Sequence, residues 1–157
     1  MNEPTYLPTR KNNYVIPPNE SKSHDLDVIE KAKHASASEI YDGLFQNAFQ
    51  AMYVENHDGI ILKFNKQFCK LFGYSDSEMS KVENEDLFVM DEKPFLRFLD
   101  ERNKKRIAKG EITGIKKTGK KFPCRISSVI YESEYGDTRT MNTLVDISGD
   151  LSARWNF

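Results

Sequence analysis

The order in which helix-like and strand-like patterns follow one another is the most restrictive feature of this chain. Five short β-rich runs are predicted at residues 51–55, 60–64, 111–117, 121–132 and 138–147. The main helical segment, residues 65–108, lies between the second and third runs. Because short turns can join the strands on either side, while one long crossover holds the helices, this order predicts an α+β fold. We expect a five-stranded antiparallel sheet with helices on one face, preceded by an N-terminal helix.

Turn and capping residues give the expected boundaries within this order. Asp58-Gly59 supplies the positive φ of a tight hairpin, Asn65 is a predicted helix N-cap, and Gly73 is expected to end that helix. Pro94 suits the first position of a longer helix through about Ala108, which Lys109-Gly110 would end. The inner face of this helix is predicted to carry Phe95, Phe98, Leu99 and Ile107.

The N-terminal part of the chain differs in composition from the rest. Residues 1–24 are rich in proline, asparagine and serine and predict a disordered or loosely ordered tail. Residues 25–39 follow helical spacing and predict a flanking helix, with a break at the small residues Ala35–Ser38. The predicted domain spans residues 40–148, and residues 149–157 form a C-terminal tail.

The charge balance argues against several classes of partner. The formal net charge is −1, so no global field attracts nucleic acid or an anionic membrane. The basic residues of the long helix are interpreted as a solvated face: Arg102, Lys104, Lys105, Arg106 and Lys109. No run approaches the roughly 18 apolar residues of a membrane span, and no export signal follows Met1. A cytoplasmic protein without a membrane span or a nucleic-acid partner is expected.

The residues that most often perform chemistry do not converge on a known pattern. Cys69 and Cys124 each lie in an apolar run and are interpreted as buried, unpaired thiols. His34 and His57 have no histidine or cysteine near them at metal-ligand spacing, which predicts no metal site. No Ser/His/Asp set lies on a credible motif, so we expect that the chain is not an enzyme.

Three motifs in order resemble the PAS domains of the S-box type. The run from Gly59 to Met79 matches a G-x-I-x-x-x-N-x-x-F-x-x-x-x-G-Y-x-x-x-E-L/M pattern. Residues 116–123 are similar to the basic-x-G-x-x-F-P hairpin of this family, and residues 145–148 are similar to its closing D-I-T/S signature. Together the motifs cover about residues 40–148, and they are more specific in combination than any one is alone.

The resemblance implies a sensor module. Such domains hold a small molecule, or nothing, between the helices and the inner face of the sheet, and they often dimerise through an N-terminal helix. Neither of two familiar cofactors fits this sequence. No histidine occurs between residues 60 and 157 to bind haem from the long helix, and residues 82–87 lack the cysteine of the flavin-binding subgroup. The cofactor, if there is one, is unknown.

Two hypotheses follow from the resemblance. In the first, the domain senses a small-molecule ligand in a cavity framed by Tyr53, Phe72, Phe95, Leu99, Cys124, Ser128 and Asn142. Ordinary core packing is the alternative role for each of these residues. In the second, a ligand-free interaction module pairs with a second copy or a partner through Leu26, Ile29, Ile40, Leu44 and Phe45.

Both hypotheses require partners. A homodimer is expected, together with a downstream signalling partner or an output domain outside this chain, as in two-component systems. Residues 151–157 are too few to hold an output domain. The chain is therefore expected either to act through separate partners or to be part of a longer sensor.

Overall fold

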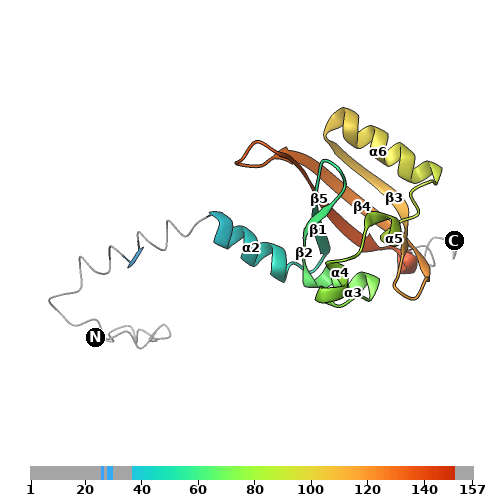
Figure 1. Cartoon of the computed structure of the whole chain (residues 1–157), viewed down its shortest axis with the longest axis horizontal. Helices are drawn as coiled ribbons and strands as arrows, with labels where there is room; N and C mark the ends of the chain where they lie inside the picture. The colour runs from blue at the N-terminus through green and yellow to red at the C-terminus, as the bar shows by residue number, and fades with distance from the viewer. Residues whose placement is uncertain (1–25, 27, 30–36, 151–157) are drawn as a thin grey trace, which may run out of the picture. The chain divides into compact units, whose positions relative to one another are not determined.

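One antiparallel sheet forms the framework of the domain in the computed structural model, which describes residues 26, 28–29 and 37–150 (Figure 1). Its strands are β1 (Ala51–Asn56), β2 (Ile61–Phe64), β3 (Ile107–Ile115), β4 (Lys121–Glu132) and β5 (Thr138–Asp146). They lie in the order β2-β1-β5-β4-β3, and every neighbouring pair is antiparallel. The α+β fold predicted from the sequence is confirmed.

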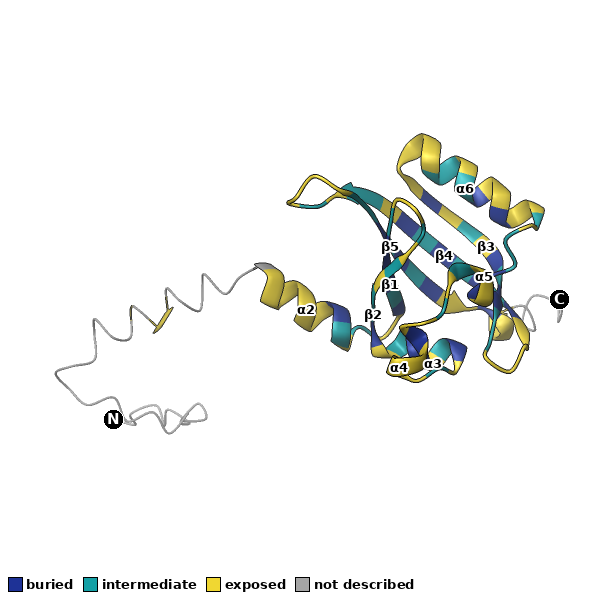
Figure 2. Cartoon of the chain, in the orientation of Figure 1, coloured by how far each residue is buried: buried dark blue, intermediate teal, exposed yellow. Residues whose placement is uncertain are grey.

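Four helices fill the crossover between β2 and β3 and pack on one face of the sheet. They are α3 (Lys66–Phe72), α4 (Asp76–Met79), α5 (Asn84–Leu87) and α6 (Lys93–Lys105). A further helix, α2 (Ala37–Asn47), precedes β1. Side chains of β4 alternate between the two faces, and those buried under the helices are Phe122, Cys124, Ile126 and Ser128. Figure 2 shows this alternation as dark bands along the strands. The helices contribute Phe68, Phe72, Met79, Leu87, Phe95 and Phe98 to the same core.

The predicted capping residues act as expected. Asn65 is the N-cap of α3, and its Oδ1 accepts a hydrogen bond of 3.0 Å from the backbone N–H of Phe68. Gly73 ends this helix with a φ of 84°. Ser75 caps α4, and Gly59 closes the turn between β1 and β2 with a φ of 80°. These boundaries depend on local chemistry, which the sequence displays directly.

The end of the long helix was predicted wrongly. α6 ends at Lys105, because Arg106 adopts a left-handed conformation with a φ of 63° and β3 begins at Ile107. Ile107 is therefore not on the inner face of the helix but is an exposed strand residue. Gly110 does not end the helix either. It lies in β3 where a Cβ would be 3.2 Å from Phe98, so this glycine lets α6 approach the sheet closely.

The chain divides between Ile40 and Tyr41 into two units, each described by itself. In the first unit Leu26, Val28 and Ile29 are helical and exposed. α2 begins at Ala37, so the predicted small-residue break is wrong for residues 37 and 38. Several predicted segments lie outside the described residues. They are the tail of residues 1–24, much of the helix of residues 25–39, including residues 35–36, and residues 151–157. The predicted domain limits stay predictions.

Gly114 of β3 faces its cross-strand partner Phe122 with no room for a side chain. A Cβ on Gly114 would lie 2.5 Å from Cζ of Phe122, whose ring is 2% exposed and meets Phe72 edge-on. We expect Gly114→Ala to lower the free energy of unfolding by about 2 kcal/mol, because the buried ring must leave its packed position. Urea denaturation measures this change. Gly43→Ala in α2, where no atom lies within 4 Å of an added Cβ, is the control, and equal stability of the two variants would contradict the argument.

Candidate functional site

A buried carboxylate on the inner face of the sheet is the centre of the site. Alternation along β1 turns Tyr53 and Glu55 toward the helices, and Glu55 is only 3% exposed. Arg102 in the last turn of α6 reaches this carboxylate, and its Nη1 donates to Oε1 over 2.7 Å. The guanidinium also lies over the ring of Phe98, 5.8 Å from the ring centroid. The ion pair therefore joins α6 to β1.

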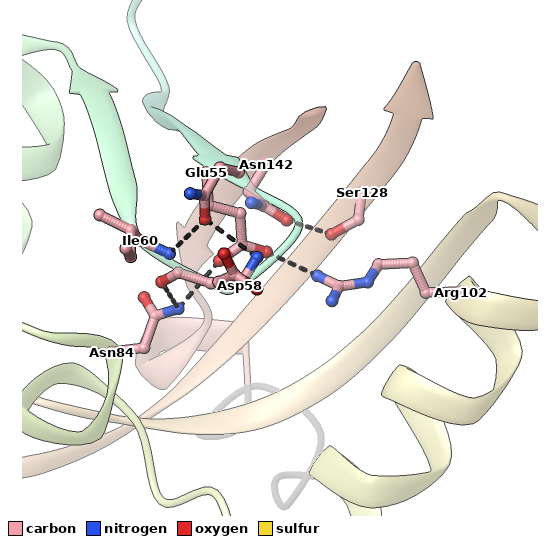
Figure 3. A network of polar contacts seen from close by, with 9 residues as sticks. Glu55, Asp58, Ile60, Asn84, Arg102, Ser128 and Asn142 are labelled. Carbon is pink, nitrogen blue, oxygen red and sulfur yellow. Dashed lines mark hydrogen bonds and ion pairs between the residues drawn. The ribbon is translucent and has the colours of Figure 1, made fainter. Parts of the chain in front are cut away.

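Asn84, the first residue of α5, brings a third segment to the same carboxylate. Its Nδ2 donates to Oε2 of Glu55 over 2.9 Å and to the carbonyl oxygen of Gly59 over 2.8 Å. Figure 3 shows Glu55 between Asn84 and Arg102. Both carboxylate oxygens thus accept hydrogen bonds, which is the condition under which a buried charge is tolerated.

A second polar pair lies on the inner face of the neighbouring strands. Ser128 of β4 donates its hydroxyl to Oδ1 of Asn142 on β5, and these residues are 1% and 0% exposed. Asn142 is also the cross-strand partner of Tyr53, which places this pair next to the row that holds Glu55. The inner face of the sheet therefore carries polar groups at its centre as well as apolar ones.

Three buried polar atoms in this region have no hydrogen-bond partner among the described residues. They are Nδ2 of Asn142, Nε of Arg102 and Oδ1 of Asn84. An unpaired polar atom in the interior costs about 1–3 kcal/mol. Native proteins therefore rarely keep several together unless a bound molecule or ordered water brings the missing bonds. These atoms mark the region as one suited to a polar guest.

A cavity of about 180 Å³ lies against these groups. Its polar lining comes from Glu55, Asn84 and Arg102, with the exposed His57 and Asp58. Its remaining lining is mostly aromatic and aliphatic: Tyr53, Phe88, Met90, Phe95, Phe98, Leu99 and Ile126. Aromatic and aliphatic side chains combined with a few fixed polar groups are typical of small-molecule sites.

The phenol of Tyr53 is held in its neutral form. Burial, with a smaller contribution from the Glu55 carboxylate, raises the pKa of Tyr53 well above its ordinary value. The hydroxyl therefore stays protonated at neutral pH and can donate or accept a hydrogen bond.

A wider hollow of about 560 Å³ shares part of its lining with this cavity. The shared residues are Asp58, Gly59, Asn84 and Met90. Because Asn84 lines both spaces, its bonds to Glu55 and to Gly59 lie where the two spaces adjoin.

The structure brings together some of the ligand-site residues predicted from the sequence. Tyr53, Phe95 and Leu99 line the cavity, and Ser128 and Asn142 form the buried polar pair beside it. Phe72 and Cys124 are fully buried but are not among the cavity-lining residues. Phe72 meets Phe88 and Phe122 edge-on, and burial raises the pKa of Cys124 to about 12, as expected for a core thiol.

The charged members of the site were missed by the sequence analysis. Arg102 was assigned to a solvated helix face, which is wrong, because its side chain is only 16% exposed. Two signals could have found the pair. Glu55 follows Tyr53 by two residues and so shares its face of β1, while Arg102 follows Phe98 by four residues and so shares its side of α6.

The predicted partner residues divide into two groups. Leu26, Ile29, Ile40 and Leu44 are 62%, 48%, 57% and 69% exposed and are open to a partner. Phe45 was predicted wrongly as a contact residue, since it is 1% exposed within its own domain. Its ring lies under Lys63, and its carbonyl oxygen accepts a hydrogen bond from Asn65.

Two absences hold for the described part of the chain. No group of three or more histidine, cysteine, aspartate or glutamate residues there could hold a metal ion. Residues 26, 28–29 and 37–150 also contain no helix with the length and apolar character needed to cross a membrane.

Comparison with known proteins agrees with this architecture. A PAS domain from a two-component sensor histidine kinase superposes with a TM-score of 0.61 at 16% identity, covering 69% of this chain and 95% of that one. A PAS domain from Colwellia psychrerythraea gives 0.63 at 20% identity, covering 73% and 99%. The PAS domain of a LuxR-family transcriptional regulator from Burkholderia thailandensis, solved in complex with ethanol, gives 0.59 at 15% identity, covering 69% and 97%.

Sequence comparison points to the same family. No curated protein sequence matches the chain significantly. The family model described as "PAS domain" matches residues 50–149, which include all five strands and the helices α3 to α6 but not α2. This match extends over more than half of the 157 residues. The chain therefore belongs to the PAS domain family, whose members are sensory and signalling modules.

Proposed function

We propose that this PAS domain binds a small ligand in the cavity lined by Glu55, Asn84 and Arg102, and that it signals through contacts with a second copy or a partner. It acts by binding rather than by turnover. The main support for ligand binding is the buried, hydrogen-bonded Glu55–Arg102 pair, which lies beside unpaired polar atoms in an aromatic-lined cavity. Aromatic surface supplies most of the burial for a ligand, and a few polar groups orient it.

The same contacts offer a way to transmit occupancy. Glu55 connects β1 to α6 through Arg102 and to α5 through Asn84, so a ligand that engages these groups acts on three elements at once. A ligand shifts the conformation of a protein by the difference in its affinity for the two states. The solved LuxR-family PAS domain in complex with ethanol supports the idea that a domain of this fold holds a small organic molecule.

The test is mass spectrometry of small molecules released from the freshly purified protein. We expect Leu99→Phe to lose the released molecule, because the larger side chain occupies the cavity that Leu99 lines. Leu96→Phe is the matched control, since Leu96 is 53% exposed on the same helix and does not line the cavity. Equal recovery from both variants, or no molecule from the unaltered protein, would count against ligand binding at this cavity.

A ligand-free interaction module is the second candidate. Ile40 and Leu44 lie four residues apart on α2, on the same side of the helix, and both are more than half exposed. Exposed apolar side chains in a row are typical of a contact surface. We expect Ile40→Ser with Leu44→Ser to convert a dimer to a monomer in light scattering after gel filtration. Leu96→Ser should leave the mass unchanged, and a monomeric unaltered protein would contradict this candidate.

A further inference from the structure

The buried charges of the cavity lining are already balanced. The side chains of Arg102 and Glu55 are 16% and 4% exposed, and the carboxylate also accepts a bond from Asn84. The other ionisable groups of the charged lining, His57 and Asp58, are exposed. A ligand with a net charge would therefore meet a neutral pair rather than an opposite charge, and taking a charge out of water without a compensating charge is costly. The cavity favours an uncharged molecule.

Among the buried polar atoms of the cavity lining, one donor and one acceptor lack a hydrogen-bond partner in the described part of the chain. Nε of Arg102 is an N–H donor without a partner among the described residues, and Oδ1 of Asn84 is an acceptor without one. Both side chains line the cavity. A molecule with a carbonyl oxygen and an N–H or O–H group offers the two complementary atoms, whereas a hydrocarbon offers neither.

The volume limits the size of the guest. The cavity measures about 180 Å³, and an apolar protein cavity of about 150 Å³ holds a benzene molecule. The rings of Phe88, Phe95 and Phe98 belong to its lining, and aromatic side chains favour a flat guest. A single six-membered ring with one small substituent fits these limits, and a fused-ring cofactor does not.

Resting on the ligand-binding function proposed above, we propose a chemical class for the ligand. The cavity takes an uncharged molecule of the size of one six-membered ring, with a single substituent that both accepts and donates hydrogen bonds. Arg102 serves the acceptor of that substituent, Asn84 serves its donor, and the aromatic lining covers the ring. The Glu55–Arg102 pair excludes charged molecules of equal size.

The test uses four probes that share one ring: benzamide, toluene, benzoate and benzylammonium. Binding to the 157-residue chain is followed by nuclear magnetic resonance titration of its backbone amides. Benzamide is expected to bind at least about tenfold more tightly than toluene, because it supplies partners for two buried polar atoms. The two charged probes are expected to bind at least about tenfold more weakly than benzamide, because each brings an unbalanced charge into the interior.

Two pairs of variants separate the possible outcomes. Leu99→Phe should abolish benzamide binding while Leu96→Phe retains it, and Asn84→Ala should reduce the advantage of benzamide over toluene. Benzoate or benzylammonium binding as tightly as benzamide, and lost in Leu99→Phe, would overturn the ligand class but leave ligand binding intact. Toluene binding as tightly as benzamide would overturn the role of the polar atoms. If no probe shifts the amides of cavity residues and no molecule co-purifies, the proposed function fails as well.

Discussion

Arg102→Met is expected to lower the free energy of unfolding by about 3 kcal/mol. The substitution keeps a long unbranched side chain on α6 but removes the charge that lies 2.7 Å from Glu55. Glu55 is 3% exposed, so its carboxylate would become an uncompensated buried charge. Removing one partner of a buried ion pair costs about 3–5 kcal/mol. We expect the lower end of this range, because the Arg102 side chain is itself 16% exposed. Urea denaturation of both proteins at neutral pH measures the difference.

The control lies on the same helix. Arg97 is exposed, and Arg97→Met is expected to change stability by no more than about 0.5 kcal/mol. Combining Glu55→Gln with Arg102→Met removes both charges and should recover part of the lost stability, because no ion is then left buried without a partner. If Arg102→Met were as mild as Arg97→Met, or if the double variant were no more stable than Arg102→Met alone, the pair would not have the role assigned to it.

The apolar half of the site could be predicted from the sequence because it follows from periodicity. Phe95 and Leu99 lie four residues apart on one side of α6, and Tyr53 lies on the inward face of a short apolar strand. Such patterns report which face of an element is buried, and the cavity is lined by buried faces. Phe72 follows the same rule, yet it packs against other rings instead. Periodicity identifies burial and does not distinguish a cavity wall from a filled core.

The polar half could not be predicted in the same way. The side chain of a charged residue is normally expected to face solvent unless a partner for it is known. The partner of Glu55 lies 47 residues further along the chain, and only the packing of α6 against the sheet brings the two together. The end of α6 shows the same limit. Gly110 looked like a helix stop, but its small size serves a tertiary contact with Phe98.

Asn65→Ala is expected to cost about 3 kcal/mol of unfolding free energy, because this one side chain serves four backbone groups. Its Oδ1 accepts from the N–H groups of Phe68 and Met52, each over 3.0 Å. Its Nδ2 donates to the carbonyl oxygens of Phe45 and Gln50, over 3.0 and 2.9 Å. Loss of a helix cap costs about 1 kcal/mol, and each buried group left unpaired adds about 1–3 kcal/mol unless water reaches it. Chemical denaturation measures the total.

Asn65→Asp separates the cap from the wider role. Aspartate is as good an N-cap as asparagine, so a residue that only capped α3 would tolerate this change. An aspartate cannot donate to Phe45 or Gln50, however, and it would place a carboxylate against two carbonyl oxygens. We therefore expect Asn65→Asp to be at least as destabilising as Asn65→Ala at neutral pH. Ser75→Ala, at the exposed cap of α4, should cost only about 1 kcal/mol. If Asn65→Asp were neutral, Asn65 would be a helix cap alone, and the link between the end of α2, β1 and α3 would not depend on it.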